Sequence, residues 1–388
     1  GDLDAPDIPT PRSYAEAIEG PYSSQWQAAM DAEMASWKST GTYRTPGSPP
    51  VFKARYVARG FSQLQGVDFF HTFFPTPKMT TLRGLLHVAA HRDYELHSLD
   101  FSTAFLQGSL HEEIWLRRPP GFTGSFPAGT QWSLWRPVYG LRQAPREWHD
   151  TLRTTLATLG FAPSTADPSL FLRTDTTLPP FYVLGYVDDL VFATADTDAL
   201  AHVKSFNALA SRTPRHIPLL CPLVTRSQPH LRTSPTSGMG LVLGGRARVV
   251  LTGHTDASWV DDLATQRSSQ GYTFSLGSGS VSLRSTRSSS VLSSSCEAEI
   301  YAGAMAAQEL RWLTYLLSDL GEAPRSPRVL YVDNKAMLAL CQEHILEHRT
   351  KHIALRYFLA RELQQRGQLR LAYVASRANT VDVFTKAL

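Results

Sequence analysis

Apolar residues follow two kinds of spacing along the chain, and together they predict a mixed α/β protein. In residues 13–37, apolar positions such as Ala17 and Met30 lie at helical spacing and fit one or two amphipathic helices. Residues 51–204 alternate short strand-like apolar runs with helical stretches, and the same alternation returns from residue 241 to the end. We therefore expect two α/β units and no internal repeat.

The stretch between the two units has a different composition. It carries five prolines in residues 206–237, and no acidic residue occurs between Asp198 and Asp256. Prolines at that frequency interrupt helices and central strands. The predicted organisation is a loose segment over 1–12, a folded unit over 13–204, a Pro/Ser-rich linker over 205–238 and a second folded unit over 239–388.

A pair of adjacent acids marks the first unit. The run Tyr186-Val-Asp-Asp-Leu lies between apolar stretches and predicts a β-hairpin with Asp188 and Asp189 at a buried turn. An isolated Asp pair is more often a plain surface turn, but a third acid, Asp100, ends another strand-like run upstream. Carboxylates held this close repel one another unless a cation lies between them. The pattern predicts a site for two Mg²⁺ ions that face phosphates.

The second unit carries its own acids at the ends of predicted elements. We expect a strand that ends at Asp256 and another that ends at Asp333. Ser294 and Glu297 fit a capping box that starts a long helix to Leu320, with Glu299 in its first turn and Gly321 as its stop. Each acid alone is an ordinary cap or strand-end residue. Their joint placement with Asp382, near the C-terminus, predicts a second pair of Mg²⁺ ions.

Composition narrows the class of protein. The 388 residues suffice for two or three domains, and the 43% hydrophobic content excludes wholesale disorder. The net charge of +4 suits a polyanionic partner. The three cysteines lie far apart, without disulfide or zinc spacing, and favour a reducing intracellular setting. No apolar run predicts a membrane span. The acidic N-terminus lacks the apolar core of a signal peptide, and the absence of an initial Met suggests a piece of a longer polyprotein.

Longer motifs resemble a known family. They include Phe52-Lys-Ala-Arg-Tyr-Val-Ala-Arg-Gly, Leu99-Asp-Phe-Ser-Thr-Ala-Phe-Leu-Gln-Gly, Tyr139-Gly-Leu-Arg-Gln-Ala-Pro-Arg-Glu-Trp, Leu292-Ser-Ser-Ser-Cys-Glu-Ala-Glu, Val332-Asp-Asn-Lys-Ala and Asp382-Val-Phe-Thr-Lys-Ala-Leu. In this order they resemble the reverse transcriptase and RNase H region of copia-type LTR retrotransposon Pol polyproteins. The resemblance implies an α+β palm-and-fingers polymerase remnant, followed by an RNase H-like α/β domain with a central mixed sheet.

The resemblance also implies roles in the first unit. Asp100, Asp188 and Asp189 would hold two Mg²⁺ ions, with Mn²⁺ as an alternative, for RNA-directed DNA polymerisation. Phe105 would lie under the sugar and select deoxynucleotides, where a plain core Phe is the competing interpretation. The residues matched to nucleotide binding are Phe105, Gln143, Lys53, Arg55 and Arg59. A solvated basic strand face is the alternative for the last three.

In the second unit, Asp256, Glu299, Asp333 and Asp382 would hold two Mg²⁺ ions that serve hydrolysis of RNA in an RNA–DNA hybrid. Implied partners are an RNA template, a DNA primer, the hybrid and deoxynucleoside triphosphates. The expected location is the cytoplasm, in a virus-like particle, with a nuclear phase. Asn334, Lys335, Arg284 and Arg287 are weaker candidates for nucleic-acid contact, with a loop role as the alternative.

The chain also departs from the family pattern. Part of the fingers before Val51 is shorter, and the thumb and connection are replaced by the Pro-rich stretch. RNase H activity alone, or an inactive nucleic-acid-binding remnant, are therefore alternatives. An integrase would need a Glu where Gln368 stands. His348 and His352 have the spacing of a metal pair, but their basic neighbours favour a plain basic helix face.

Overall fold

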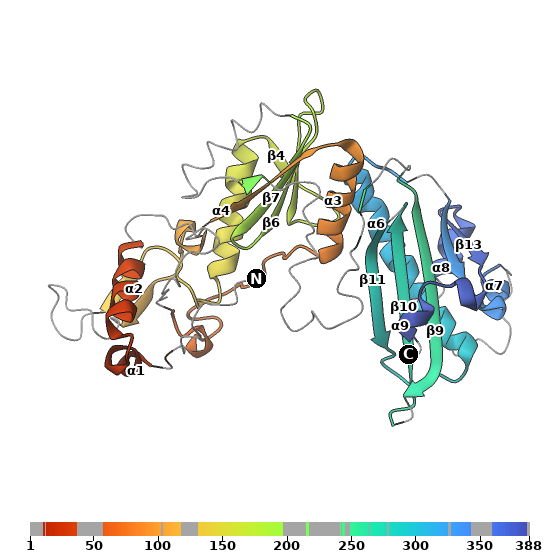
Figure 1. Ribbon diagram of the computed structural model, residues 1–388, viewed down its shortest axis with the longest axis horizontal. Helices are drawn as coiled ribbons and strands as arrows, with labels where there is room; N and C mark the ends of the chain where they lie inside the picture. The colour runs from red at the N-terminus through yellow and green to blue at the C-terminus, as the bar shows by residue number, and fades with distance from the viewer. Residues whose placement is uncertain are drawn as a thin grey trace.

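The computed structural model describes residues 11, 13–36, 57–101, 104–117, 131–196, 215–216, 241, 243–244, 249–262, 264–277, 279–324, 327–342 and 359–385. Two β-sheets dominate these ranges, with helices packed between and around them (Figure 1). The predicted mixed α/β class is confirmed. No helix in these ranges has both the length and the apolar content needed to cross a bilayer.

The N-terminal sheet has six strands in the order β4-β5-β6-β7-β1-β8, all paired antiparallel. Their bounds are β1 (Glu95–Asp100), β4 (Phe161–Pro163), β5 (Leu170–Arg173), β6 (Phe181–Tyr186), β7 (Asp189–Thr194) and β8 (Arg215–His216). The first four residues of β6 are all buried because the sheet is covered on both faces. Phe181 and Val183 pack with α4 (Ala144–Thr158), and Tyr182 and Leu184 pack with the C-terminal half of the molecule.

Smaller elements precede and flank this sheet. The two helices expected over residues 13–37 are present as α1 (Tyr14–Glu19) and α2 (Ser23–Ser36). Short turns η1 (Gly60–Ser62) and η2 (Ala104–Gln107) and the hairpin of β2 (Ile114–Arg117) with β3 (Gln131–Leu134) lie beside α4.

The C-terminal sheet has five strands in the order β11-β10-β9-β12-β13. The strands are β9 (Leu251–Asp262), β10 (Arg267–Leu276), β11 (Gly279–Arg287), β12 (Arg328–Val332) and β13 (Leu369–Tyr373). The first three form an antiparallel meander, and β12 runs parallel to both β9 and β13. The expected mixed sheet is therefore present. Its helices are α6 (Ser295–Asp319), α7 (Lys335–Gln342), α8 (Leu359–Gln365) and α9 (Asp382–Thr385), with the turn η6 (Ser376–Ala378).

The long helix α6 begins and ends as the sequence predicts. Ser294 is its N-cap and accepts a hydrogen bond from the backbone N–H of Glu297. The Glu297 carboxylate accepts from Ser293 rather than from Ser294, so the reciprocal bond of a capping box is displaced by one residue. Gly321 follows the helix with a φ of 74°, a left-handed conformation that suits glycine.

The two halves share one hydrophobic core. Helix α3 (Met79–Arg92) lies between the sheets beside α6 (Figure 1), and its buried face joins the back of the N-terminal sheet to α6. Polar contacts reinforce this packing: Trp312 donates to the Ala166 carbonyl over 2.8 Å, and Tyr182 donates to the Leu320 carbonyl over 3.0 Å. The sequence indicated two units joined by a linker, and it contained no signal for this direct docking.

One part of the expected linker is ordered. Arg215 and His216 form β8 and pair with Ser98 and His97 of β1. These two residues lie within the linker predicted over 205–238, so part of that stretch pairs with the sheet. Strand β1 pairs with β7 along one edge, and β8 pairs with its opposite edge at His97 and Ser98, which covers part of an otherwise open sheet edge.

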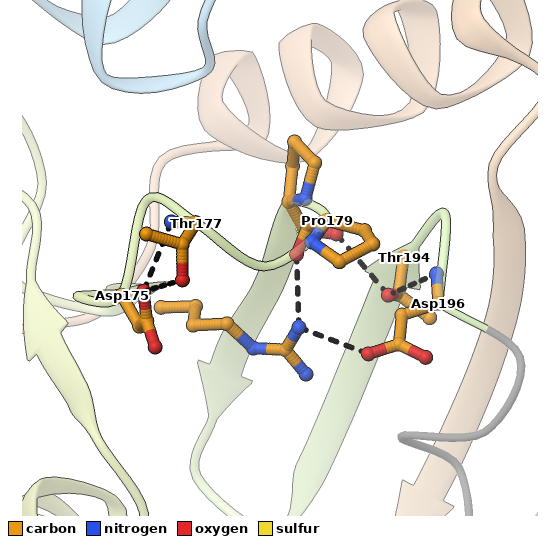
Figure 2. Close-up of polar contacts among 7 residues, drawn as sticks. Asp175, Thr177, Pro179, Thr194 and Asp196 are labelled. Carbon is orange, nitrogen blue, oxygen red and sulfur yellow. Dashed lines mark hydrogen bonds and ion pairs between the residues drawn. The ribbon is translucent and has the colours of Figure 1, made fainter.

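The end of the β6–β7 hairpin far from the Asp pair is tied by side chains. Arg173 donates to the Pro179 carbonyl over 2.9 Å and to the Asp196 carboxylate over 3.0 Å. Figure 2 shows this end, where the Thr194 hydroxyl also donates to the carbonyl of Pro180. A slip of one residue would turn every side chain to the opposite face, so contacts that fix the register also fix the position of the turn.

Candidate active sites

The turn between β6 and β7 brings the three acids of the first unit together at the level of the backbone. Asp100 of β1 pairs with Asp189 of β7, and the Phe101 N–H donates to the Asp188 carbonyl over 2.7 Å. Partner Cα atoms in an antiparallel pair lie about 5 Å apart. Asp188 is half-buried and Asp189 is exposed, so the turn is less buried than predicted. For Asp100 the structure describes the backbone only.

The turn has an unusual backbone that its surroundings hold in place. Val187 has a φ of 53°, a conformation that a β-branched residue adopts at a cost of order 1–3 kcal/mol. Its carbonyl accepts a hydrogen bond from the indole of Trp148, which is buried on α4. The sequence reasoning assigned no role to Trp148. A Trp among the buried positions of a helix was the available signal, because a buried indole N–H requires an acceptor.

The residue Gly185 next to the turn has a packing reason. A Cβ there would lie 3.3 Å from the side chains of both Leu152 and Leu190, so a larger residue would crowd the contact between β6 and α4. The glycine at this position therefore admits α4 to the sheet.

Two predicted nucleotide-binding residues of the first unit have different environments. Phe105 is half-buried on η2, and its ring meets that of Tyr139 edge-on at 5.1 Å. Gln143 is fully buried: its side chain donates to the Asp68 carbonyl over 3.0 Å and accepts from Gln63 over 3.1 Å. Gln143 therefore ties two chain segments together through its buried side chain, and its assignment to nucleotide binding stays a prediction.

The basic candidates of the first unit are partly described. Arg59 is exposed at the start of η1, while Lys53 and Arg55 lie outside the described residues. Two chain segments cross at Gly60 and Gly140. A Cβ on Gly60 would lie 1.9 Å from the Gly140 carbonyl oxygen, so position 60 requires glycine. This crossing fixes the start of η1 against the segment that leads into α4.

The C-terminal sheet assembles three of its four predicted acids. Each of Asp256, Glu299 and Asp333 offers a carboxylate oxygen within 4.8 Å of the others. Asp256 is 2% exposed and Glu299 is 5% exposed, so two of the three charges are almost removed from water. Such a cluster of like charges is costly unless a cation or protons neutralise it.

The elements place these acids by simple rules. Asp256 lies in the middle of β9, which continues to Asp262 because β10 pairs along its whole length; the strand end predicted at Asp256 is wrong. Glu299 is the fifth residue of α6, one residue beyond the predicted first turn. Asp333 directly follows β12, as predicted, and β12 lies beside β9.

Asp382 is close to this cluster but is not one of the three. It is the first residue of α9, which packs on β9, β10 and β11, and its side chain is half-buried. The hydroxyl of Thr385, on the same short helix, donates to Oδ2 of Asp256. Sequence reasoning gave Thr385 no role, although it lies three residues after Asp382 and therefore on the same helical face.

A thiol lies beside the cluster. Burial raises the pKa of Cys296, and the nearby Glu299 carboxylate raises it further. The thiol therefore stays protonated near neutral pH and adds no negative charge to the site.

The weaker candidates have local partners. Arg287 forms an ion pair with Asp262, and Asn334 accepts a hydrogen bond from the Met337 N–H at the start of α7. Lys335 lies over the ring of Tyr373, and Arg284 is exposed on β11. His348 and His352 lie outside the described residues.

The donor set of the C-terminal cluster fits a hard divalent cation. Three carboxylates from β9, α6 and the end of β12 provide the oxygen ligands that Mg²⁺ and Mn²⁺ prefer. The mutual repulsion of buried carboxylates is the physical reason for expecting a bound cation. At the N-terminal hairpin, Asp188 and Asp189 supply the same type of donor.

Comparisons with known proteins identify the family of the chain. Residues 48–212 match the family model described as reverse transcriptase (RNA-dependent DNA polymerase). The retrovirus-related Pol polyprotein from transposon RE2 of Arabidopsis thaliana is 30% identical over 447 aligned positions, which cover 91% of this chain and 31% of that protein. The Pol polyprotein from transposon TNT 1-94 of Nicotiana tabacum is 26% identical over 503 positions, covering 97% of this chain and 38% of that protein.

A solved structure with a weaker match is the N-terminal RNase H domain of rv2228c from Mycobacterium tuberculosis. It is 12% identical, with a TM-score of 0.27, and the match covers 35% of this chain and 91% of that one.

The N-terminal sheet with its Asp-Asp hairpin lies within the reverse transcriptase match and is the palm that the resemblance implies. The C-terminal sheet has the mixed strand order and the acidic cluster expected of the RNase H-like domain. The chain belongs to the Pol polyproteins of copia-type retrotransposons. It spans about a third of the length of the curated relatives named above. The alignment to the tobacco relative is longer than the 388 residues of this chain, so that relative carries residues that the chain lacks.

Proposed function

We propose that the chain acts on RNA–DNA hybrids at two sites: RNA-directed DNA synthesis at the palm hairpin and hydrolysis of the RNA strand at the C-terminal sheet. The observation that carries the proposal is the convergence of Asp256, Glu299 and Asp333 within 4.8 Å. Asp382 is assigned to the same site from its place on α9.

The residues of the C-terminal site would hold two Mg²⁺ ions, or Mn²⁺, which activate a water and stabilise the oxygen that leaves phosphorus. The buried carboxylates of Asp256 and Glu299 would keep fixed positions during this reaction, because their strand and helix pack in the core. At the palm, Asp100, Asp188 and Asp189 would hold the ions, and the primer 3′-hydroxyl would displace pyrophosphate from a deoxynucleoside triphosphate. Phe105 would contact the sugar, and Arg59 would approach the triphosphate.

A crossed pair of assays tests both halves. One assay measures extension of a DNA primer on an RNA template, and the other measures cleavage of labelled RNA in a hybrid, each with Mg²⁺. Asp188→Asn should abolish extension and preserve cleavage, and Asp333→Asn should do the reverse. Each variant is thus the folded control for the other.

RNase H activity alone is the second candidate. It is favoured by the residues that the tobacco relative carries and this chain lacks. The resemblance implies that the Pro-rich stretch replaces the thumb, which grips the primer in a polymerase. Cleavage without extension by the wild-type chain would select it. Hybrid cleavage that survives Asp333→Asn would overturn the proposed site.

A further inference from the structure

The short helix α9 sits in a notch on the C-terminal sheet. A Cβ on Gly271 of β10 would lie 2.9 Å from Cγ1 of Val381 and 3.2 Å from Cγ2 of Thr385. Gly271 is also the partner of Asp256 in the register of β10 and β9. The absence of a side chain at Gly271 therefore allows α9 to approach the strand that carries Asp256.

The segment before α9 is hydrogen-bonded to β9. The buried Asn379 side chain donates to the Thr255 carbonyl over 3.0 Å, and its own oxygen accepts from the Val381 N–H over 3.3 Å. Val381 is fully buried. These contacts bind the segment to β9 next to Asp256 and hold α9 over the acids.

The hydroxyl of Thr385 completes this arrangement. Thr385 is 2% exposed, and its Oγ1 donates to Oδ2 of Asp256. The Asp382 carbonyl is a second acceptor at 3.3 Å, but the Asp256 carboxylate oxygen is nearer and is therefore the main acceptor. The hydrogen bond between the buried Thr385 hydroxyl and Oδ2 restricts rotation of the buried Asp256 carboxylate, and Oδ1 then points away from Thr385.

We propose that Thr385 is a positioning residue of the C-terminal site, which orients the Asp256 carboxylate for a divalent cation and ties α9, with Asp382, to β9. The inference rests on the proposed function. Groups that hydrogen-bond a metal ligand typically change metal affinity by roughly 10- to 100-fold when they are removed.

The test measures cation binding rather than turnover. Mn²⁺ is titrated into the full chain and followed by the loss of the free-ion signal in electron paramagnetic resonance. The parent carries Asp188→Asn and Asp189→Asn to remove the palm acids, and a further Asp256→Asn variant defines the signal without the C-terminal site. Thr385→Val removes the hydroxyl and keeps the shape, whereas Thr385→Ser keeps the hydroxyl and removes the methyl group.

We expect Thr385→Val to weaken Mn²⁺ binding by about 10-fold or more and Thr385→Ser to bind like the parent. Gly271→Ala, which keeps the hydroxyl but displaces α9, should weaken binding as well. Thermal unfolding in a chelator checks that each variant is folded; if Thr385→Val is not, the Ser and Gly271 variants decide.

Unchanged binding in folded Thr385→Val, or equal losses in Val and Ser, would overturn the inference and leave the proposed function in place. A parent that binds no Mn²⁺ beyond the Asp256→Asn control would overturn the proposed C-terminal site itself, and the inference with it.

Discussion

The junction between the palm and the C-terminal half depends on one carboxylate. Asp319 is the last residue of α6, where the helix dipole disfavours negative charge. Its Oδ2 accepts from the Ser164 hydroxyl over 2.6 Å and from the Thr165 N–H over 3.1 Å. These donors belong to the turn between β4 and β5 of the palm. The unfavourable position on the helix is therefore offset by contacts across the junction.

The magnitude follows from these contacts. A hydrogen bond to a charged group contributes about 1.5–3 kcal/mol, and partial exposure of Asp319 reduces the sum of its bonds. Removal of the charge also removes its unfavourable interaction with the helix dipole, which stabilises the chain by about 0.5 kcal/mol. We therefore expect Asp319→Ala to lower the free energy of unfolding by about 2 kcal/mol. Urea unfolding followed by tryptophan fluorescence measures this change, because Trp312 donates to Ala166 across the same junction.

A matched control separates this effect from loss of any helix carboxylate. Glu362 is exposed on α8 and pairs with Arg366 one turn later, so Glu362→Gln should change the free energy of unfolding by less than about 0.5 kcal/mol. Amide hydrogen exchange should also rise in the turn at Ser164 in Asp319→Ala. Equal unfolding curves for the two variants would refute the assigned role of Asp319.

Two further predictions concern buried positions. A Cβ on Gly253 would lie 2.3 Å from the ring of Phe274, so Gly253→Ala should destabilise the chain by about 1–3 kcal/mol, and an unchanged urea midpoint would contradict this. Burial, aided by His91, lowers the pKa of His87 from 6.5 to about 4, so the unfolded chain binds the proton first as the pH falls. Between pH 6.5 and pH 4 the free energy of unfolding of the wild type should therefore fall by up to about 3 kcal/mol more than that of His87→Gln. Parallel curves of unfolding free energy against pH for the two proteins would disprove this prediction.

Local patterns in the sequence were sufficient for the elements and for the identity of the acids. Ser294 and Gly321 marked the ends of α6 because caps depend on a few neighbouring residues. The apolar runs around Asp188 predicted the β6–β7 hairpin because strand pairing across a short turn is also local. The motifs that resemble the family then indicated which carboxylates belong to a site.

Other features depended on contacts between residues far apart in the chain. Gln143 matched a nucleotide-binding motif, yet its side chain is buried against segments about 80 residues away. The strand through Asp256 continued beyond its predicted end because β10 lies beside it. In both cases a short stretch of sequence around the residue does not indicate its contact partner.

The sequence by itself determined the ends of α6, the β6–β7 hairpin, the family and the candidate acidic residues, since these follow from local spacing and residue type. The tertiary structure decided that Asp256, Glu299 and Asp333 meet, that α9 reaches Asp256 through Thr385, and that the palm packs directly on the C-terminal half. The physical reason is that buried carboxylates, close backbone approaches and shared cores arise only when distant segments fold against one another.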